Sequence, residues 1–141
     1  MSQAIKIASF NLKHDSPFAR KNTWFYRREL ISELIRQSNA AIIGVQELIP
    51  SMREDIMARL SGRYSIRGFG RNKRMGDEQS AILLKNDDVK VSFDKVFWLS
   101  KHPEKLGSRA YYAVFPRICT VCEAYVEELG TKVRVFNTHF D

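Results

Sequence analysis

The sequence predicts an α/β (α+β) fold in which helices pack on one face of a mixed β-sheet. Three apolar runs indicate the strands, at residues 4–10, 40–48 and 132–138, and each leads into polar residues. The run at 40–48 carries no charge before Glu47, which is typical of a strand covered on both faces. Segments with helical periodicity separate the early strands, so the chain begins β-α-β-α and is then mostly β.

The first part of the chain predicts a strand–helix–strand unit. Residues 4–10 form a small strand, and the charged segment 13–21 is expected to be a loop. Asn22 is suited to cap the following helix, whose apolar residues recur on one face and which should stop near 38–39. A strand at 41–46 comes next. Such a unit is parallel and right-handed by default.

A second helix is expected to begin at Pro50 and to end at Gly62, because proline suits the first helical turn and glycine suits the position after the last. The strands at 79–85 and 89–99 are expected to be antiparallel and joined by a turn at 86–88. The later strands are expected at residues 64–69, 79–85, 89–99, 111–126 (one or two strands) and 132–138.

The second face of this predicted sheet is also apolar, and the sequence predicts no further helix to cover it. An exposed apolar face larger than a few hundred Å² is unusual for a monomer. We therefore expect either self-association or pairing with a further polypeptide segment.

Composition favours a globular protein with an anionic partner. The 141 residues suffice for one domain. No apolar segment approaches the ~18 residues of a membrane span and no signal peptide is evident, so a cytoplasmic location is expected. The net charge of +7 suits nucleic acid or a phosphorylated small molecule. The loop at 68–78 contains several cations that are suited to a nucleic-acid backbone, although a merely solvated loop is the alternative.

Cys119 and Cys122 have the spacing of zinc ligands, but no second Cys or His pair follows them. They lie in 118–126, a predicted strand. Residues three apart on a strand point to opposite faces, so these sulfurs cannot share a metal. Buried free thiols are the prediction.

Six short motifs occur in order: SFNL at 9–12, GVQE at 44–47, GDE at 76–78, FWLS at 97–100, PR at 116–117 and NTHFD at 137–141. Together they resemble the endonuclease/exonuclease/phosphatase superfamily, the metal-dependent phosphoesterases related to pancreatic deoxyribonuclease. The resemblance covers essentially the whole chain. It implies half of a four-layer α/β/β/α sandwich.

The resemblance also implies a role for each of five residues. Glu47 corresponds to the ligand of Mg²⁺ (Mn²⁺ is possible), and Asn11 to the asparagine that helps hold phosphate and metal. His139 corresponds to the histidine near the scissile phosphate, Glu78 to the carboxylate that orients it, and Arg117 to a phosphate-binding arginine. Phosphodiester hydrolysis requires such groups, because charge must be neutralised and protons moved at the phosphate.

Plain structural interpretations stay open for these residues. In these interpretations Glu47 simply precedes a helix, Asn11 caps a turn, and His139 is a satisfied core histidine. Glu78 in its loop and Arg117 at a strand edge are then only solvated. His14 and Asp15 follow Asn11 closely, but solvated loop positions are the expectation for both.

The superfamily pattern continues into a second half with Gly-Asp-x-Asn and Ser-Asp-His motifs, which residues 1–141 do not contain. The prediction is therefore the N-terminal half of a phosphoesterase domain that needs a C-terminal half for activity. The alternative is a non-catalytic basic module that binds nucleic acid or another phosphorylated ligand. The substrate is a phosphate ester, which the charge tilts toward nucleic acid, and DNA, RNA and phosphoinositides all remain open.

Overall fold

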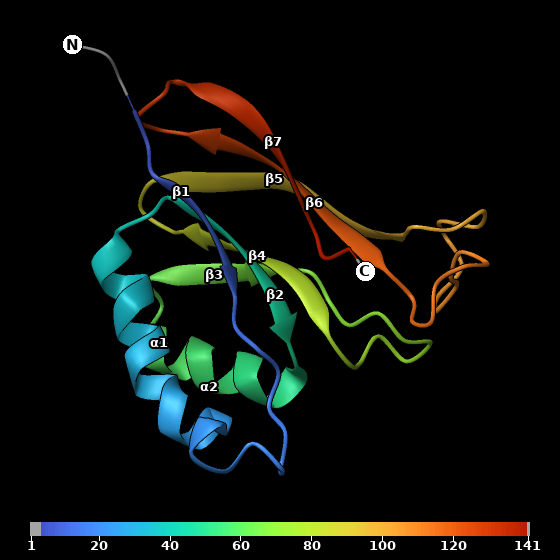
Figure 1. Cartoon of the computed structure of the whole chain (residues 1–141). Coiled ribbons are helices and arrows are strands. Elements are labelled where there is room, and N and C mark those ends of the chain that lie inside the picture. Colours follow the sequence, from blue (N-terminus) through green and yellow to red (C-terminus); the bar gives the residue numbers. More distant parts are fainter. Residues whose placement is uncertain (1–3, 141) are drawn as a thin grey trace.

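The computed structural model describes residues 4–140, which form two β-sheets packed face to face with helices on the outer side of the first sheet (Figure 1). The α-helices are α1 (Trp24–Ser38) and α2 (Pro50–Leu60). The strands are β1 (Ile7–Asn11), β2 (Ile42–Leu48), β3 (Tyr64–Arg67), β4 (Gln79–Lys85), β5 (Val89–Trp98), β6 (Ile118–Val126) and β7 (Thr131–Thr138). The predicted α/β class is confirmed.

The first sheet is mixed and has the strand order β1-β2-β4-β3. Strands β1 and β2 are parallel and joined through α1, as the sequence predicts, while β4 runs antiparallel to both of its neighbours. The second sheet, β5-β6-β7, is antiparallel throughout. Within residues 4–140, no helix combines the length and apolar character that crossing a membrane requires.

The expectation of a β4–β5 hairpin is wrong. Both strands form, but the turn at 86–88 carries the chain from the first sheet to the second, where β5 pairs with β6. The second sheet consequently covers the inner face of the first sheet. The expectation that this apolar face is left uncovered is therefore wrong too. Apolar side chains of both sheets meet in this interface: Ile42, Ile82, Leu84, Cys122, Ala124 and Val126.

Both cysteines lie buried in β6 with free thiols, as the sequence predicts. Their register partners on β7 are Thr138 for Cys119 and Val135 for Cys122. Burial raises the pKa of each thiol, to about 11 for Cys122. The thiolate that metal binding requires is therefore disfavoured at both positions.

Edge strands β1 and β7 leave one side of the sandwich open. Ile7 on β1 and Phe136 on β7 are largely exposed. A cavity of about 300 Å³ lies between these strands and is lined by residues of β1, β2 and β7. The unpaired backbone of such edges is a ready surface for further strands.

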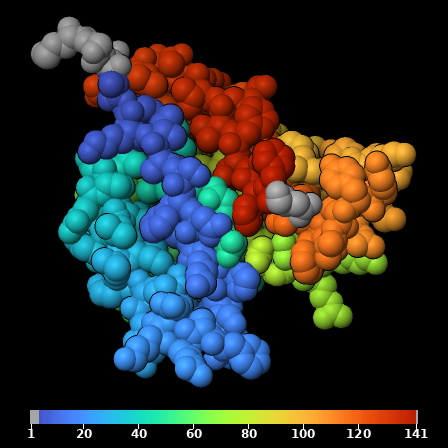
Figure 2. Space-filling model, in the orientation of Figure 1, coloured from blue at the N-terminus to red at the C-terminus, as the bar shows by residue number. Residues whose placement is uncertain are grey.

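Two long loops extend from the strands on the opposite side from the helices. Residues 68–78 connect β3 to β4, and residues 99–117 connect β5 to β6. Figure 1 shows both projecting on the right, and in Figure 2 the atoms of the second loop, in orange, stand out from the body of the molecule. Residues of both loops line one small cavity, together with Glu47 and His139.

Helix α1 begins differently from the prediction that Asn22 caps it. Asn22 lies in a short 3-10 helix (Arg20–Asn22), and α1 starts two residues later. The Asp15 carboxylate instead accepts the Trp24 backbone N–H at 2.7 Å, which satisfies one of the free donors at the helix start. Asn39 ends the helix in the left-handed conformation (φ 50°), close to the predicted position.

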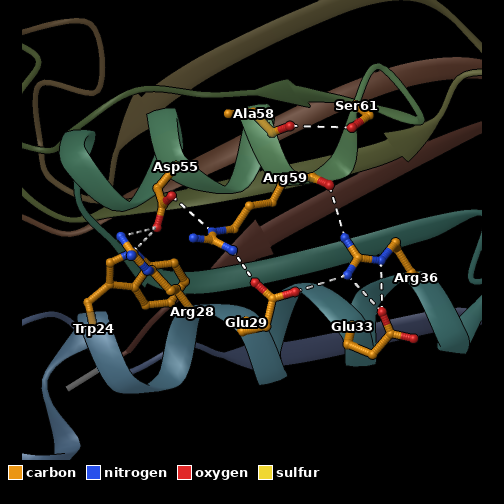
Figure 3. Close-up of polar contacts among 9 residues, drawn as sticks. All are labelled: Trp24, Arg28, Glu29, Glu33, Arg36, Asp55, Ala58, Arg59 and Ser61. Carbon is orange, nitrogen blue, oxygen red and sulfur yellow. Dashed lines mark hydrogen bonds and ion pairs between the residues drawn. The ribbon is translucent and has the colours of Figure 1, made fainter.

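An ion-pair network joins α1 to α2 (Figure 3). Asp55 of α2 accepts the Trp24 indole N–H at 2.8 Å and the Arg59 Nε–H at 3.0 Å. Arg59 also forms an ion pair with Glu29 of α1. On the same helix pair, Arg36 donates to the Arg59 carbonyl oxygen at 2.9 Å. These contacts fix the helices on the first sheet, and thereby the strand–helix connections that lead to the site.

Candidate functional site

Glu47 lies at the carboxyl end of β2 and has left-handed backbone geometry (φ 59°). The pairing of β2 with β4 is irregular between Val45 and Leu48, so Glu47 departs from the regular strand. Asn11 ends the parallel strand β1 beside it. Its Nδ2 donates to the Glu47 carboxylate at 2.9 Å, and the backbone N–H of His14 donates to the other carboxylate oxygen at 2.9 Å.

These hydrogen bonds set the charge state of Glu47. Burial by itself would raise the pKa of its carboxyl group, but the donors from Asn11 and His14 outweigh burial and hold the pKa below its ordinary value. The carboxylate is therefore charged at neutral pH. A charged, partly buried carboxylate at the end of a strand is suited to bind a cation.

His14 brings Glu47 together with Glu78. Its Nδ1 lies 3.2 Å from a Glu47 carboxylate oxygen and 2.9 Å from a Glu78 carboxylate oxygen. The three groups offer ligand atoms that all lie within 4.8 Å of one another. His14 is an exposed loop residue, as expected, and it also lies at the site, next to both carboxylates. Its distance of only three residues from Asn11 was the available signal.

Arg71 holds Glu78 in place. This arginine is buried, at 8% exposure, and it forms ion pairs with Asp77 at 2.9 Å and Glu78 at 3.0 Å. The Trp98 indole N–H donates to its carbonyl oxygen at 2.7 Å. Gly70 is required just before it, because a Cβ there would lie 1.7 Å from the Gly76 carbonyl oxygen. The loop 68–78 is therefore a fixed support for Glu78.

His139 and Arg117 line the same small cavity as Glu47 and Glu78. The Nδ1 atom of His139 is buried and has no hydrogen-bond partner among residues 4–140. In that part of the chain no hydrogen bond joins Glu78 to His139, since the Glu78 oxygens contact His14 and Arg71. The predicted pairing of Glu78 with His139 stays a prediction, and so do the assigned roles of all five site residues.

Asn137 ties the second sheet to the first, two residues before His139. Its Nδ2 donates to the carbonyl oxygens of Val45 at 2.9 Å and Ala81 at 2.8 Å, and its Oδ1 accepts from the Gln46 side chain at 2.8 Å. The sequence did not predict this role. The available signal was the place of Asn137 two positions before His139.

The fold and this polar site define a class: an α/β sandwich with carboxylates, amide and imidazole gathered where β1, β2 and β7 end and β4 begins. No protein-family model and no curated protein matches the sequence. Solved structures match it well. An endonuclease/exonuclease/phosphatase from Bacteroides vulgatus is 29% identical with a TM-score of 0.92, over 97% of this chain and 52% of that chain. A mannosyl-6-phosphatase from Bacteroides thetaiotaomicron is also 29% identical with a TM-score of 0.92, over 98% of this chain and 52% of that one.

TDP2 from D. rerio, in complex with a single-strand DNA product, is a more distant match. It is 16% identical with a TM-score of 0.63, over 96% of this chain and 45% of that chain, so this likeness concerns the fold alone. The chain spans about half the length of these solved structures. The predicted resemblance to the endonuclease/exonuclease/phosphatase superfamily is confirmed, and the chain has the fold of about half of such a protein.

Proposed function

We propose that residues 1–141 form the N-terminal half of a metal-dependent phosphoesterase domain in which Glu47 binds the metal. The observation that carries the proposal is the convergence of Glu47, Glu78 and His14 within 4.8 Å, in a place where His139 and Arg117 line the adjoining cavity. The similarity to a phosphatase over half of that protein's length supports it.

The residues present fit a hard divalent cation. Glu47 and Glu78 supply carboxylate oxygens, and His14 a nitrogen, within the reach of one ion. Mg²⁺ prefers oxygen ligands and several waters, whereas Mn²⁺ also accepts imidazole, so both ions suit this set. Held by Glu47, Glu78 and His14, such a cation would supply neutralisation of charge on phosphoryl oxygens and activation of water.

The remaining residues have distinct tasks in this proposal. Asn11 orients the Glu47 carboxylate through its Nδ2. The Arg117 guanidinium binds phosphate oxygens, for which its planar fork is suited. His139, whose Nδ1 has no partner among the described residues, moves a proton or stabilises charge at the phosphate, and Glu78 supports that histidine's charged form from the same cavity.

We further propose that a C-terminal half of the domain completes the site and covers the open side between β1 and β7. The exposed Ile7 and Phe136 and the cavity between the edge strands support this partner. Sequencing the coding DNA past codon 141 tests it directly. If the frame stops there, light scattering on residues 1–141 shows whether self-association covers the open side instead. A stable monomer would then contradict both a C-terminal half and a second copy as the partner.

The catalytic proposal is tested in the full protein with Glu47→Gln. Hydrolysis of p-nitrophenyl phosphate and bis(p-nitrophenyl) phosphate is measured in Mg²⁺, Mn²⁺ and EDTA. We expect the variant to lose at least about a hundredfold in rate, because it retains the shape of the side chain but not its charge. Glu54→Gln makes the same change at an exposed position of α2 and should leave the rate unchanged.

Two outcomes would count against the proposal. Metal-dependent hydrolysis that survives Glu47→Gln would remove Glu47 from the site. Absence of hydrolysis by the full protein, combined with nucleic-acid binding that is equal in Mg²⁺ and EDTA, would support the non-catalytic binding module instead.

A further inference from the structure

A surface of exposed aromatic side chains lies on the loop 99–117. Tyr111 is 94% exposed, Tyr112 is 74% exposed, and Phe115 is 51% exposed. Large aromatic residues that are this open to water are costly unless they have a partner. This loop is the orange segment that stands out in Figure 2.

The loop presents these rings in a fixed arrangement. The rings of Tyr111 and Tyr112 meet edge to face, with centroids 5.3 Å apart and planes at 85°. Arg109 closes the turn beneath them by donating to the carbonyl oxygens of Ala113 at 3.1 Å and Val114 at 3.0 Å. The ring faces are consequently available to a ligand without prior rearrangement of the loop.

The aromatic surface is continuous with the candidate active site. The Arg71 guanidinium lies 4.9 Å from the centre of the Phe115 ring, and the same guanidinium is paired with Glu78. The loops 68–78 and 99–117 also touch at Gly107, where a Cβ would lie 2.7 Å from Lys73 Cγ. The loop that carries the tyrosines therefore also borders the candidate active site, through Phe115 beside Arg71 and through Arg117 in the cavity lining.

Basic side chains surround the rings. Lys101, Lys105 and Arg109 are exposed on the same loop, and Lys73 on the neighbouring one. A cavity of about 520 Å³ is lined by Lys101, Arg109 and both tyrosines, among others. The acidic residue of this loop, Glu104, is paired with Lys95 at 2.8 Å. Lys73, Lys101, Lys105 and Arg109 form no ion pair within residues 4–140, so the surface combines ring faces with positive charge, which complements a polyanion that carries flat bases.

We propose that Tyr111, Tyr112 and the surrounding cations bind single-stranded nucleic acid and direct one of its phosphodiesters to the cavity of Glu47 and His139. The location of the reacting phosphate rests on the proposed function; the binding itself does not. Bases stack on exposed rings only when they are unpaired, which favours a single strand over a duplex. Lysine and arginine contacts to the backbone supply sequence-independent affinity.

Fluorescence anisotropy of a labelled single-stranded oligothymidine in EDTA tests the proposal without hydrolysis. Stacking contributes roughly 1–3 kcal/mol per base, so the double variant Tyr111→Ala/Tyr112→Ala, which removes both rings, should weaken binding by at least about thirtyfold. Tyr111→Phe/Tyr112→Phe retains the rings and should retain the affinity. Raising the salt concentration should weaken binding of the wild type.

Phe25 and Tyr26 on α1 provide a matched control. Their rings have the same edge-to-face arrangement, at 5.3 Å and 88°, and they are 63% and 65% exposed. Phe25→Ala/Tyr26→Ala should leave binding unchanged. Equal losses in both double variants, or no loss on removing Tyr111 and Tyr112, would overturn the proposal.

Further arms separate other partners and the catalytic proposal. Two results would each overturn the single-strand assignment. One is duplex DNA that binds as tightly as the single strand. The other is a Tyr111→Ala/Tyr112→Ala variant that loses binding to anionic phospholipid vesicles but not to the oligonucleotide. Glu47→Gln should bind the oligonucleotide normally. Binding of the oligonucleotide and hydrolysis are thus measured separately. Failure of the binding proposal can therefore be told apart from failure of the catalytic proposal.

Discussion

Asn137 should be among the most costly polar residues to replace in this chain. It is buried between the sheets and makes three hydrogen bonds, two as donor to backbone carbonyls of the first sheet and one as acceptor from Gln46. Asn137→Ala removes all three hydrogen bonds. At about 1 kcal/mol per bond, the free energy of unfolding should fall by about 3 kcal/mol.

Urea unfolding followed by tryptophan fluorescence measures this loss. With an m-value of about 1.5 kcal/mol per M, a loss of about 3 kcal/mol lowers the midpoint by about 2 M. Asn86→Ala makes the same change in an exposed turn, where the side chain bonds to the Gly62 carbonyl, and should cost less than about 1 kcal/mol. An unchanged m-value in both variants shows that only stability has changed.

Asn137→Asp sharpens the test. The introduced carboxylate cannot donate to the carbonyls of Val45 and Ala81, so this variant should be less stable than Asn137→Ala at neutral pH. Burial against those oxygens raises the pKa of the introduced carboxyl group in the folded state. Its penalty therefore shrinks as the pH falls through that raised pKa, and the two variants converge. A loss below about 1 kcal/mol for Asn137→Ala, or no convergence, would refute the reasoning.

Two further predictions concern other buried groups. Asp55→Ala removes the acceptor of the Trp24 indole and of Arg59, so it should lower the free energy of unfolding by about 2 kcal/mol, while Glu54→Ala, measured alongside, should lower it by less than about 0.5 kcal/mol. Because the pKa of Cys122 is raised to about 11, its contribution to stability is complete below the ordinary thiol pKa and is lost as the pH rises toward 11. The wild type should thus lose up to about 2–3 kcal/mol more than Cys122→Ala over that pH range, as urea titrations at each pH will show.

The helices and strands could be predicted largely from local patterns. The uncharged run before Glu47 indicated β2, Pro50 marked the start of α2, and one strand lies within the expected segment 111–126, at 118–126. Residues 111–117 of that segment form a loop instead. The pairing of strands could not be predicted in the same way. The turn at 86–88 has the composition of a hairpin turn, yet β4 and β5 enter different sheets because both faces of β4 are apolar and both must be covered.

The candidate site shows the same division between local and long-range information. The motifs placed Glu47, Glu78, Arg117 and His139 around one cavity, although the sequence alone could not say which of them touch. His14 was missed because its partners are 33 and 64 positions away, and only the folded chain brings them to its Nδ1. Contacts of that kind depend on how the loops return to the sheet.

Strand β2 shows both a local pattern and long-range contacts. Neighbouring residues on a strand point to opposite faces, and Gln46 points inward to Asn137. Glu47, its neighbour, adopts φ 59° at an irregularity of the strand, a conformation that costs a non-glycine residue about 1 kcal/mol. Glycine would adopt this conformation without cost. That a glutamate occupies it, with its carboxylate held by Asn11 and His14, supports the proposal that the side chain is retained for binding rather than for stability.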